Sequence, residues 1–240
     1  MSDRLSEIKR DVAIANRILA GHGVLDALGH VSARSPVDPT HFFIARSLGP
    51  ELVTPADLQE FTFDGREVDG DPRPPYAERA IHAGIYAARP DVLAICHNHA
   101  PSVIPFGITG LQLRPVFHMA ATIGEHIPVW DIAADFGDTD LLVRSREQAD
   151  SLARALGAGR VVLMRGHGCA VACATVQEVV FTCVYLQVNV HLQLQTLSAG
   201  GEPRYLSSGE IERATTTLLQ PLTQERTWTT WSQRITPSDE

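Results

Sequence analysis

The order of the apolar segments constrains the fold of this 240-residue chain more than any other feature. Residues 3–20 carry apolar side chains at mostly helical spacing and predict an amphipathic helix, and helical periodicity returns over 76–88. Between 28 and 70, short apolar runs separated by Pro, Gly and Asp are typical of strands joined by turns. These runs are HFFIAR at 41–46, ELVTP at 51–55 and QEFTFDG at 59–65. Because the strands and helices do not alternate strictly, we expect an α/β sandwich with a largely antiparallel central sheet flanked by helices.

The second half of the chain shows the same mixture of patterns. A helix-like segment over 147–159 precedes an apolar run at 161–168, and a long helical pattern covers about 175–197. No repeat of fixed period and no low-complexity linker interrupts the sequence, so we expect a single domain over 1–240. The polar C-terminal segment at about 226–240 is expected to be partly disordered.

Charge and apolar content argue against several classes of protein. The formal charge is -8 at pH 7 and no run of Lys or Arg occurs, so neither nucleic acid nor an anionic membrane is an expected partner. No stretch of about 18 apolar residues occurs, and the N-terminus lacks the basic head and apolar block of a secretory signal. The four cysteines form no C-x-x-C pair and are expected to be buried, reduced thiols. We therefore expect a cytoplasmic protein.

Two histidines lie where an apolar run ends, in the segment VLAICHNH. Side chains at positions i and i+2 of a strand point to the same face, so His97 and His99 can reach one metal ion if the strand continues to His99. An H-x-H pair alone is weak evidence, because surface histidine pairs also arise by chance. A second apolar run, VVLMRGHG, ends in the same way at His167, between two glycines that allow a tight turn.

Three imidazoles that leave one side of an ion open are typical of catalytic metal sites, whereas structural zinc sites are closed by four protein ligands. Glu78 begins the helical segment that leads into the His97 run, where it can act as a fourth ligand or as a general acid/base. An acidic residue in a first helical turn is also explained by the helix dipole alone. His82, four residues on, is either a packing residue of that helix or a support for the site.

The pattern of these residues resembles the class II aldolase/adducin family. The resemblance rests on E-x-x-x-H-x-x-I-Y-x-x-R-P-D-V-x-A-x-x-H-x-H at 78–99, G-x-V-S-x-R at 29–34 and G-H-G at 166–168. It covers nearly the whole chain, to about residue 210. The resemblance implies an α/β/α sandwich, usually a homotetramer with active sites near subunit interfaces. It also implies that His97, His99 and His167 bind one divalent metal ion, with Glu78 as the acid/base that can approach it.

Several positions depart from the sugar-phosphate aldolases of the family. His30 replaces an Asn of the first loop, and Tyr76 with Ala77 replaces a pair of serines before the catalytic Glu, so hydroxyl donors for a phosphate are missing. Arg46 and Tyr76 instead offer a planar cation and an aromatic surface, which suit a flat ring that bears carboxylates. These segments, together with F-H-M-A around His118, most resemble the decarboxylase branch that acts on hydroxypyridine dicarboxylates or dihydroxyphthalates.

The resemblance therefore favours a carbon–carbon lyase, and within that class a non-oxidative decarboxylase of a small anionic aromatic substrate. Arg46 and Ser47 are candidates to bind the carboxylate that is retained. His30 and His118 are candidates to orient the ring hydroxyl or to relay a proton, although a structural role explains each equally well. The remaining expected substrate contacts are Tyr76 and Ser32.

The identity of the metal and the ring type are left open by the sequence. Manganese is favoured by the resemblance, but imidazole and carboxylate ligands also accept zinc, iron or cobalt. A class II sugar-phosphate aldolase or epimerase is the main alternative function. A non-haem iron oxygenase and a non-enzymatic, adducin-like binding module are the further alternatives.

Overall fold

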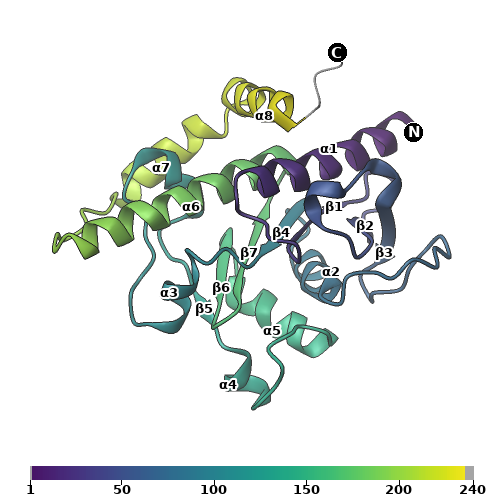
Figure 1. Ribbon diagram of the computed structural model, residues 1–240, viewed down its shortest axis with the longest axis horizontal. Helices are drawn as coiled ribbons and strands as arrows, with labels where there is room; N and C mark the ends of the chain where they lie inside the picture. Colours follow the sequence, from purple (N-terminus) through teal and green to yellow (C-terminus); the bar gives the residue numbers. More distant parts are fainter. Residues whose placement is uncertain (1, 236–240) are drawn as a thin grey trace.

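A seven-stranded sheet runs through the middle of the chain in the computed structural model, which describes residues 2–235 (Figure 1). Its spatial order is β3-β2-β1-β4-β7-β6-β5. The strands are β1 His30–Arg34, β2 His41–Ala45, β3 Leu58–Thr62, β4 Ala94–Asn98, β5 Val129–Trp130, β6 Val161–Met164 and β7 Gly168–Cys173. Every neighbouring pair is antiparallel except β5 and β6, which are parallel. The largely antiparallel sheet expected from the sequence is confirmed.

Helices cover both faces of the sheet, which confirms the α/β/α sandwich. Figure 1 shows α1 (Ser2–Gly21) and α6 (Val176–Ser198) above the sheet, and α2 (Arg79–Ala88) and α5 (Arg146–Leu156) below it. Helix α1 packs on β1 and β2, α6 packs on β4 and β7, and α5 packs on α2 and β6. Strands buried on both faces carry near-continuous apolar runs, and all residues of β4, β6 and β7 are buried.

Shorter elements connect the strands and helices. They are the 3-10 helices η1 Pro50–Leu52, η2 Pro55–Asp57 and η3 His118–Ile123, and the helices α3 Ile104–Ile108 and α4 Ile132–Phe136. The run at 51–55, for which the sequence predicted a strand, instead lies in η1 and the start of η2. Pro50 and Pro55 lack the N–H that a strand ladder requires, and Asp57 Oδ2 fixes the start of η2 by accepting from Thr54 N at 3.0 Å and from Thr54 Oγ1 at 2.7 Å.

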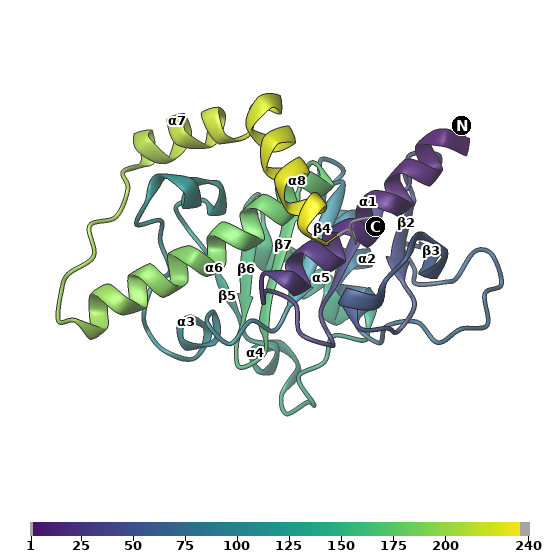
Figure 2. The ribbon, with the colours of Figure 1, turned by 45° about the horizontal axis from the view of Figure 1, so that its top comes forward.

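The C-terminal region forms two further helices, α7 (Ser208–Leu218) and α8 (Pro221–Ile235), which lie outside the α1 and α6 layer (Figure 2). Helix α8 packs on α1 and α6, and the buried Trp231 contacts the ring of Phe181. The prediction of a partly disordered tail at 226–240 therefore needs correction over 226–235, because this tryptophan anchors the segment to the core. The rest of that prediction, 236–240, lies outside the described residues.

The cysteines agree with the sequence, and the helices can be compared with the needs of a membrane span. All four cysteines are free and buried, as expected for reduced thiols. None of the helices that the structure describes combines the length and the apolar character that crossing a bilayer requires.

Candidate metal centre

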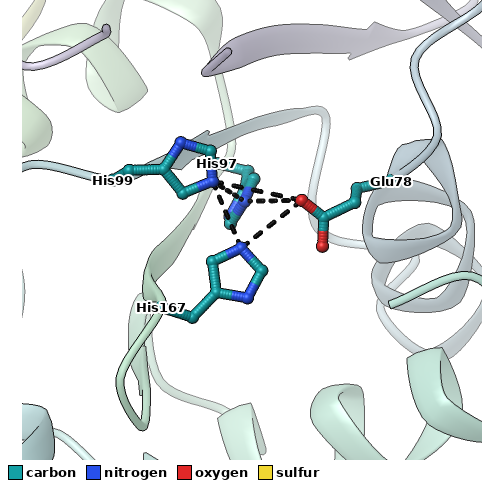
Figure 3. Close-up of side chains that lie close together, drawn as sticks. All are labelled: Glu78, His97, His99 and His167. Atoms are coloured by element: carbon teal, nitrogen blue, oxygen red, sulfur yellow. Dashed lines mark hydrogen bonds and ion pairs between the residues drawn. The ribbon is translucent and has the colours of Figure 1, made fainter. Parts of the chain in front are cut away.

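Three histidines and one carboxylate converge at one end of the central strands (Figure 3). His97 lies on β4, His99 directly follows that strand, and His167 lies in the turn between β6 and β7. Because β4 and β7 are antiparallel neighbours, with Asn98 opposite Cys169, the turn that carries His167 lies beside His99. The potential ligand atoms of Glu78 and these histidines all lie within 4.8 Å of one another, so the structure brings together the cluster that the sequence predicted.

The Nδ1 atom of each imidazole faces an oxygen acceptor. The acceptors are Cys169 O for His97 at 3.1 Å, Asp26 Oδ1 for His99 at 3.2 Å, and Leu141 O for His167 at 2.9 Å. Since a carbonyl or carboxylate oxygen only accepts, each neutral ring carries its proton on Nδ1 and a lone pair on Nε2. Hydrogen bonding of this kind fixes metal-binding histidines in the required tautomer and orientation.

The three Nε2 atoms are arranged as a metal ion would require. Nε2 of His99 lies 3.0 Å from that of His97 and 3.2 Å from that of His167. These contacts are not hydrogen bonds when the protons are on Nδ1, and the lone pairs repel one another without a cation between them. Tetrahedral ligands about 2.0–2.1 Å from zinc stand roughly 3.3 Å apart, close to the observed separations. The donor set therefore fits one divalent ion with an open side.

Glu78 lies on that open side at the start of α2. Its Oε2 lies 3.4 Å from Nε2 of His167 and 3.5 Å from Nε2 of His97, and its Oε1 accepts a hydrogen bond from Val143 N at 3.0 Å. Burial raises the pKa of Glu78, but interactions with His167 and His97 in their protonated forms outweigh burial and hold that pKa well below its ordinary value. The carboxylate is thus ionised and can approach an ion or exchange a proton.

Asp26 is a part of the site that the sequence interpretation missed. Its Oδ1 accepts from the backbone N–H of Leu28 at 3.0 Å and of Gly29 at 2.9 Å, in addition to His99. The slight burial of Asp26 raises its pKa, but the hydrogen bonds from Leu28 and His99 outweigh this and lower it. The available signal was the Asp-x-Leu-Gly segment just before β1, since Asp side chains often accept from the backbone two residues on.

The segment 141–143 makes hydrogen bonds to two residues of the site, His167 and Glu78. Leu141 accepts the hydrogen bond from His167, and Val143 donates to Glu78. Leu141 is the one non-glycine residue among those described with a positive φ, at 67°. A side chain in this region costs about 1–3 kcal/mol of strain, which persists only when the surroundings fix it. No periodicity in the sequence pointed to this segment.

A cavity of about 330 Å³ opens beside the cluster. This volume is at the lower end of the range for small-molecule sites, which suits one substituted ring. Its walls are formed by Asp26, Leu28, His30, Ser47, Tyr76, Ala77, Glu78, His99 and Leu142. Ser47 and Tyr76, both expected to contact substrate, line the cavity. The Tyr76 hydroxyl donates to Leu48 O, so the face of its ring is the part left to contact a ligand.

Two expected substrate contacts lie elsewhere. The Arg46 Nε donates to Asp57 Oδ1 at 2.8 Å, and Arg46 does not line the cavity. Ser32 is completely buried, and its hydroxyl lies 2.6 Å from His82 Nδ1 and 2.8 Å from the Tyr86 hydroxyl. Other groups of the protein thus hold the Arg46 Nε and the Ser32 hydroxyl, and the expected contact of each residue with substrate stays a prediction.

His30 and His118, the two other histidines predicted for the site, differ in their distance from the cavity: one lines it and the other does not. His30 lines the cavity, and its ring centroid lies 5.3 Å from that of His97, its direct partner across β1 and β4. His118 is exposed at the start of η3, which packs on α6 and α7, and it does not line the cavity. The structure therefore supports a role in this site for His30, whereas His118 has no contact with the site within one chain.

A family comparison agrees with the site and the fold. A model of the class II aldolase and adducin N-terminal domain matches residues 10–194. The chain belongs to the class II aldolase and adducin family. Among curated members, decarboxylase tropJ of Talaromyces stipitatus is 36% identical over 241 residues, which cover 91% of this chain and 90% of that protein.

Other members show the same relationship. The 3,4-dihydroxyphthalate decarboxylase of Arthrobacter keyseri is 29% identical over 211 residues, covering 83% of each chain. The solved L-fuculose 1-phosphate aldolase from Glaciozyma antarctica PI12 covers 97% of this chain and 89% of its own, with a TM-score of 0.76 and 23% identity. The structural match supports the fold alone, whereas the curated relatives, both named decarboxylases, support a lyase.

Proposed function

We propose that this protein is a metal-dependent, non-oxidative decarboxylase of a hydroxylated aromatic or pyridine dicarboxylic acid. The observation that carries the proposal is the convergence of three Nε2 atoms and the Glu78 carboxylate beside a cavity of ring size. The similarity to decarboxylases of the family adds support for this branch over the aldolases. The activity is therefore that of a carboxy-lyase.

The reaction breaks the bond between a ring carbon and a carboxylate carbon, and the electron pair remains on the ring as carbon dioxide leaves. His97, His99 and His167 would hold a divalent ion, which, chelated by the ring hydroxyl and the adjacent carboxylate, would supply electrostatic stabilisation of the charge left on the ring. Manganese is favoured, and zinc, iron or cobalt suit the same donors. The metal content of the purified protein, measured by mass spectrometry, identifies the native ion.

Glu78 moves the proton in this proposal. As an ionised carboxylate on the open side of the site, it takes the proton of the ring hydroxyl and then returns it to the ring carbon that carbon dioxide has left. The ring oxygen finally regains a proton from solvent, so the reaction consumes one proton for each carbon dioxide released. The observed Val143 hydrogen bond to Oε1 leaves Oε2 free for these transfers.

Substrate orientation is assigned to the cavity walls. Ser47 offers a hydroxyl to the retained carboxylate, and the Tyr76 ring offers an apolar face to the flat substrate. Burial raises the pKa of Tyr76 to about 12, so its hydroxyl stays protonated and keeps its bond to Leu48. Among the described residues, no Arg or Lys lines this cavity.

The test is an anaerobic reaction of the metal-loaded protein with 3,4-dihydroxyphthalate and, separately, with 3-hydroxy-2-methylpyridine-4,5-dicarboxylate. Carbon dioxide release from one of them establishes the reaction and selects the ring type. Release that requires dioxygen would indicate an iron oxygenase, and cleavage of a ketose phosphate without any carbon dioxide would indicate an aldolase. Failure of both ring acids and of the ketose phosphate would support the non-enzymatic binding module.

The oligomeric state remains a prediction from the family resemblance. We expect a homotetramer with active sites near subunit interfaces, and His118 contributes to catalysis only if a second copy brings it to the cavity. Light scattering during size-exclusion chromatography measures the mass directly. A monomer that retains full activity would remove His118 from the site.

A further inference from the structure

A buried chain of hydrogen bonds leads away from the cavity through four side chains. His30 lines the cavity, and its Nδ1 lies 2.8 Å from Nε2 of His82. Nδ1 of His82 lies 2.6 Å from the Ser32 hydroxyl, which lies 2.8 Å from the hydroxyl of Tyr86. All four residues are at most 2% exposed. In the proposed reaction, only His30 among them can contact substrate.

The spacing of the sequence explains why these groups meet. Glu78, His82 and Tyr86 follow one another at intervals of four: Glu78 is the N-cap residue of α2, and His82 and Tyr86 share one face of that helix, about 6 Å apart along its axis. His30 and Ser32 share one face of β1, about 6.8 Å apart. Because the two intervals are similar, His82 meets His30 and Tyr86 meets Ser32. Glu78, which comes before these two helix residues, lies at the metal centre.

Arg34 fastens this pairing at its far end. The guanidinium donates to Tyr86 O at 2.8 Å and Arg89 O at 2.9 Å, so the C-terminal end of α2 is tied to β1. Its Nε donates in addition to Val92 O at 3.0 Å. These bonds fix the position of α2 relative to β1. They therefore also keep His82 within hydrogen-bonding distance of His30.

The donor and acceptor of each hydrogen bond in this buried series can be assigned from the end that lies farthest from the cavity, at Tyr86. Tyr86 is buried, and burial raises the pKa of its hydroxyl, so the hydroxyl keeps its proton. The tyrosine proton then needs an acceptor, and Ser32 is the side chain that the structure places in reach. If Ser32 accepts from Tyr86, its own proton goes to His82 Nδ1.

The remaining protons are then determined. His82, accepting at Nδ1, carries its proton on Nε2 and donates it to His30 Nδ1. His30 in turn carries its proton on Nε2, for which the described residues offer no acceptor. Every other order leaves at least one buried hydroxyl proton without a partner, which native proteins avoid. Burial lowers the pKa of His82 to about 3, in keeping with a neutral ring at this position.

We propose that Tyr86, Ser32 and His82 are positioning residues that hold His30 as a hydrogen-bond donor, with its Nε2–H directed into the cavity toward an oxygen of the substrate. The identity of that substrate rests on the proposed function. The tautomer of His30 rests only on the hydrogen bonds described above and does not depend on that function. In this arrangement Nδ1 of His30 is occupied by the proton of His82, so His30 orients the substrate and does not carry a proton between substrate and solvent.

Neutron diffraction from perdeuterated crystals of the full chain tests the proposal directly. The expected result is a deuteron on Nε2 of both His30 and His82, with the Ser32 deuteron directed to His82. A deuteron on Nδ1 of His30 would overturn the proposal. This result is independent of decarboxylase activity, so the proposed function and the tautomer can fail separately.

Substitutions then test whether this series of hydrogen bonds contributes to the binding of a ligand in the cavity. The probe is 3,4-dihydroxybenzoate, the product expected from 3,4-dihydroxyphthalate, titrated calorimetrically into zinc-loaded protein. Ser32→Ala and His82→Leu are expected to weaken its binding about tenfold, the loss of roughly one hydrogen bond. His82→Gln retains a donor and an acceptor and should restore most of the affinity.

The matched control is Thr122→Val, which removes a buried hydroxyl that has no hydrogen-bond partner among the described residues. This variant is expected to bind like the wild type, and all variants are expected to retain their zinc. Neutron structures of Ser32→Ala should show His30 with its deuteron redistributed between the two nitrogens. An unchanged His30 tautomer in Ser32→Ala would overturn the proposed role of the chain.

Discussion

Oδ1 of Asp26 lies 3.2 Å from Nδ1 of His99, and this contact turns Nε2 of His99 toward the other two histidines. The carboxylate also caps the backbone of the loop before β1 through Leu28 and Gly29. A side chain outside the ligand set therefore fixes both the tautomer of one ligand and the wall of the cavity beside it.

Removal of this contact should weaken metal binding. In Asp26→Ala, His99 loses the acceptor that holds its tautomer, and zinc affinity is expected to fall about 10- to 100-fold. Asp26→Asn keeps an acceptor oxygen and should lose less. Competition with a chromophoric chelator measures the affinity. The control is Asp38→Ala. Asp38 also lies beside a histidine, with its Oδ2 3.6 Å from Nε2 of His41, but this pair is on a surface away from the site. Equal zinc affinities for Asp26→Ala and the wild type would contradict the assignment.

Gly168, at the start of β7, lies against the end of β4, and a side chain there should be poorly tolerated. A Cβ at this position would lie 2.0 Å from the carbonyl oxygen of Asn98, between His97 and His99. We expect Gly168→Ala to lower the free energy of unfolding by about 3 kcal/mol or more, because backbone must move to relieve the overlap. Urea denaturation of the metal-free protein measures the change.

The control for that substitution is Gly209→Ala in α7, where an added Cβ meets nothing within 4 Å. Its effect should be within about 1 kcal/mol and favourable, since alanine is the better helix former. If both alanine variants unfold at the same urea concentration as the wild type, the close approach of β4 and β7 at this point is not as described.

Arg46 should act on stability through Asp57. The slight burial of Asp57 raises its pKa, but hydrogen bonds from Thr54 and Arg46 outweigh this and lower it below its ordinary 3.8. A carboxyl whose folded pKa is lowered stabilises the protein above its unfolded pKa and loses that contribution as pH falls through the lowered value. Arg46→Met is therefore expected to cost about 1 kcal/mol at pH 7 and progressively less below pH 3.8.

The comparison for Arg46→Met is Arg66→Met, since Arg66 pairs with Asp64 on the surface and both side chains are mostly exposed. Urea denaturation at pH 7 and in acid measures both variants, and Arg66→Met should differ little from the wild type at either pH. A stability loss for Arg46→Met that is equally large in acid would show that packing, rather than the ion pair, is responsible.

The metal cluster could be predicted from the sequence because its geometry is local. His97 lies on β4 and His99 directly follows that strand, while His167 lies in the turn after β6, so their meeting required only that the ends of these strands lie close together. The antiparallel sheet was predicted for a similar reason, since the order of the apolar runs excludes regular alternation of strands and helices. The two-residue strand β5 gave no comparable signal.

The supporting residues could not be predicted because they depend on loop conformation. Asp26 and Leu141 act through single hydrogen bonds from loops, and a positive φ at a leucine contradicts its local preference. Arg46 and Ser32 have the chemistry to bind a carboxylate, but the structure pairs Arg46 with Asp57 and the buried Ser32 hydroxyl with His82. Residue type alone does not distinguish these two uses.

The most direct measurement is anaerobic carbon dioxide release from 3,4-dihydroxyphthalate by wild type and Glu78→Gln, each loaded with manganese to the same measured content. The histidine ligands are intact in both proteins, so the comparison isolates the proton-transfer role of the carboxylate. We expect release by the wild type and a loss of about 10²- to 10⁴-fold in the variant. Equal rates in the two proteins would contradict the assigned role of Glu78, and release by neither, with the pyridine dicarboxylate also inert, would contradict the decarboxylase.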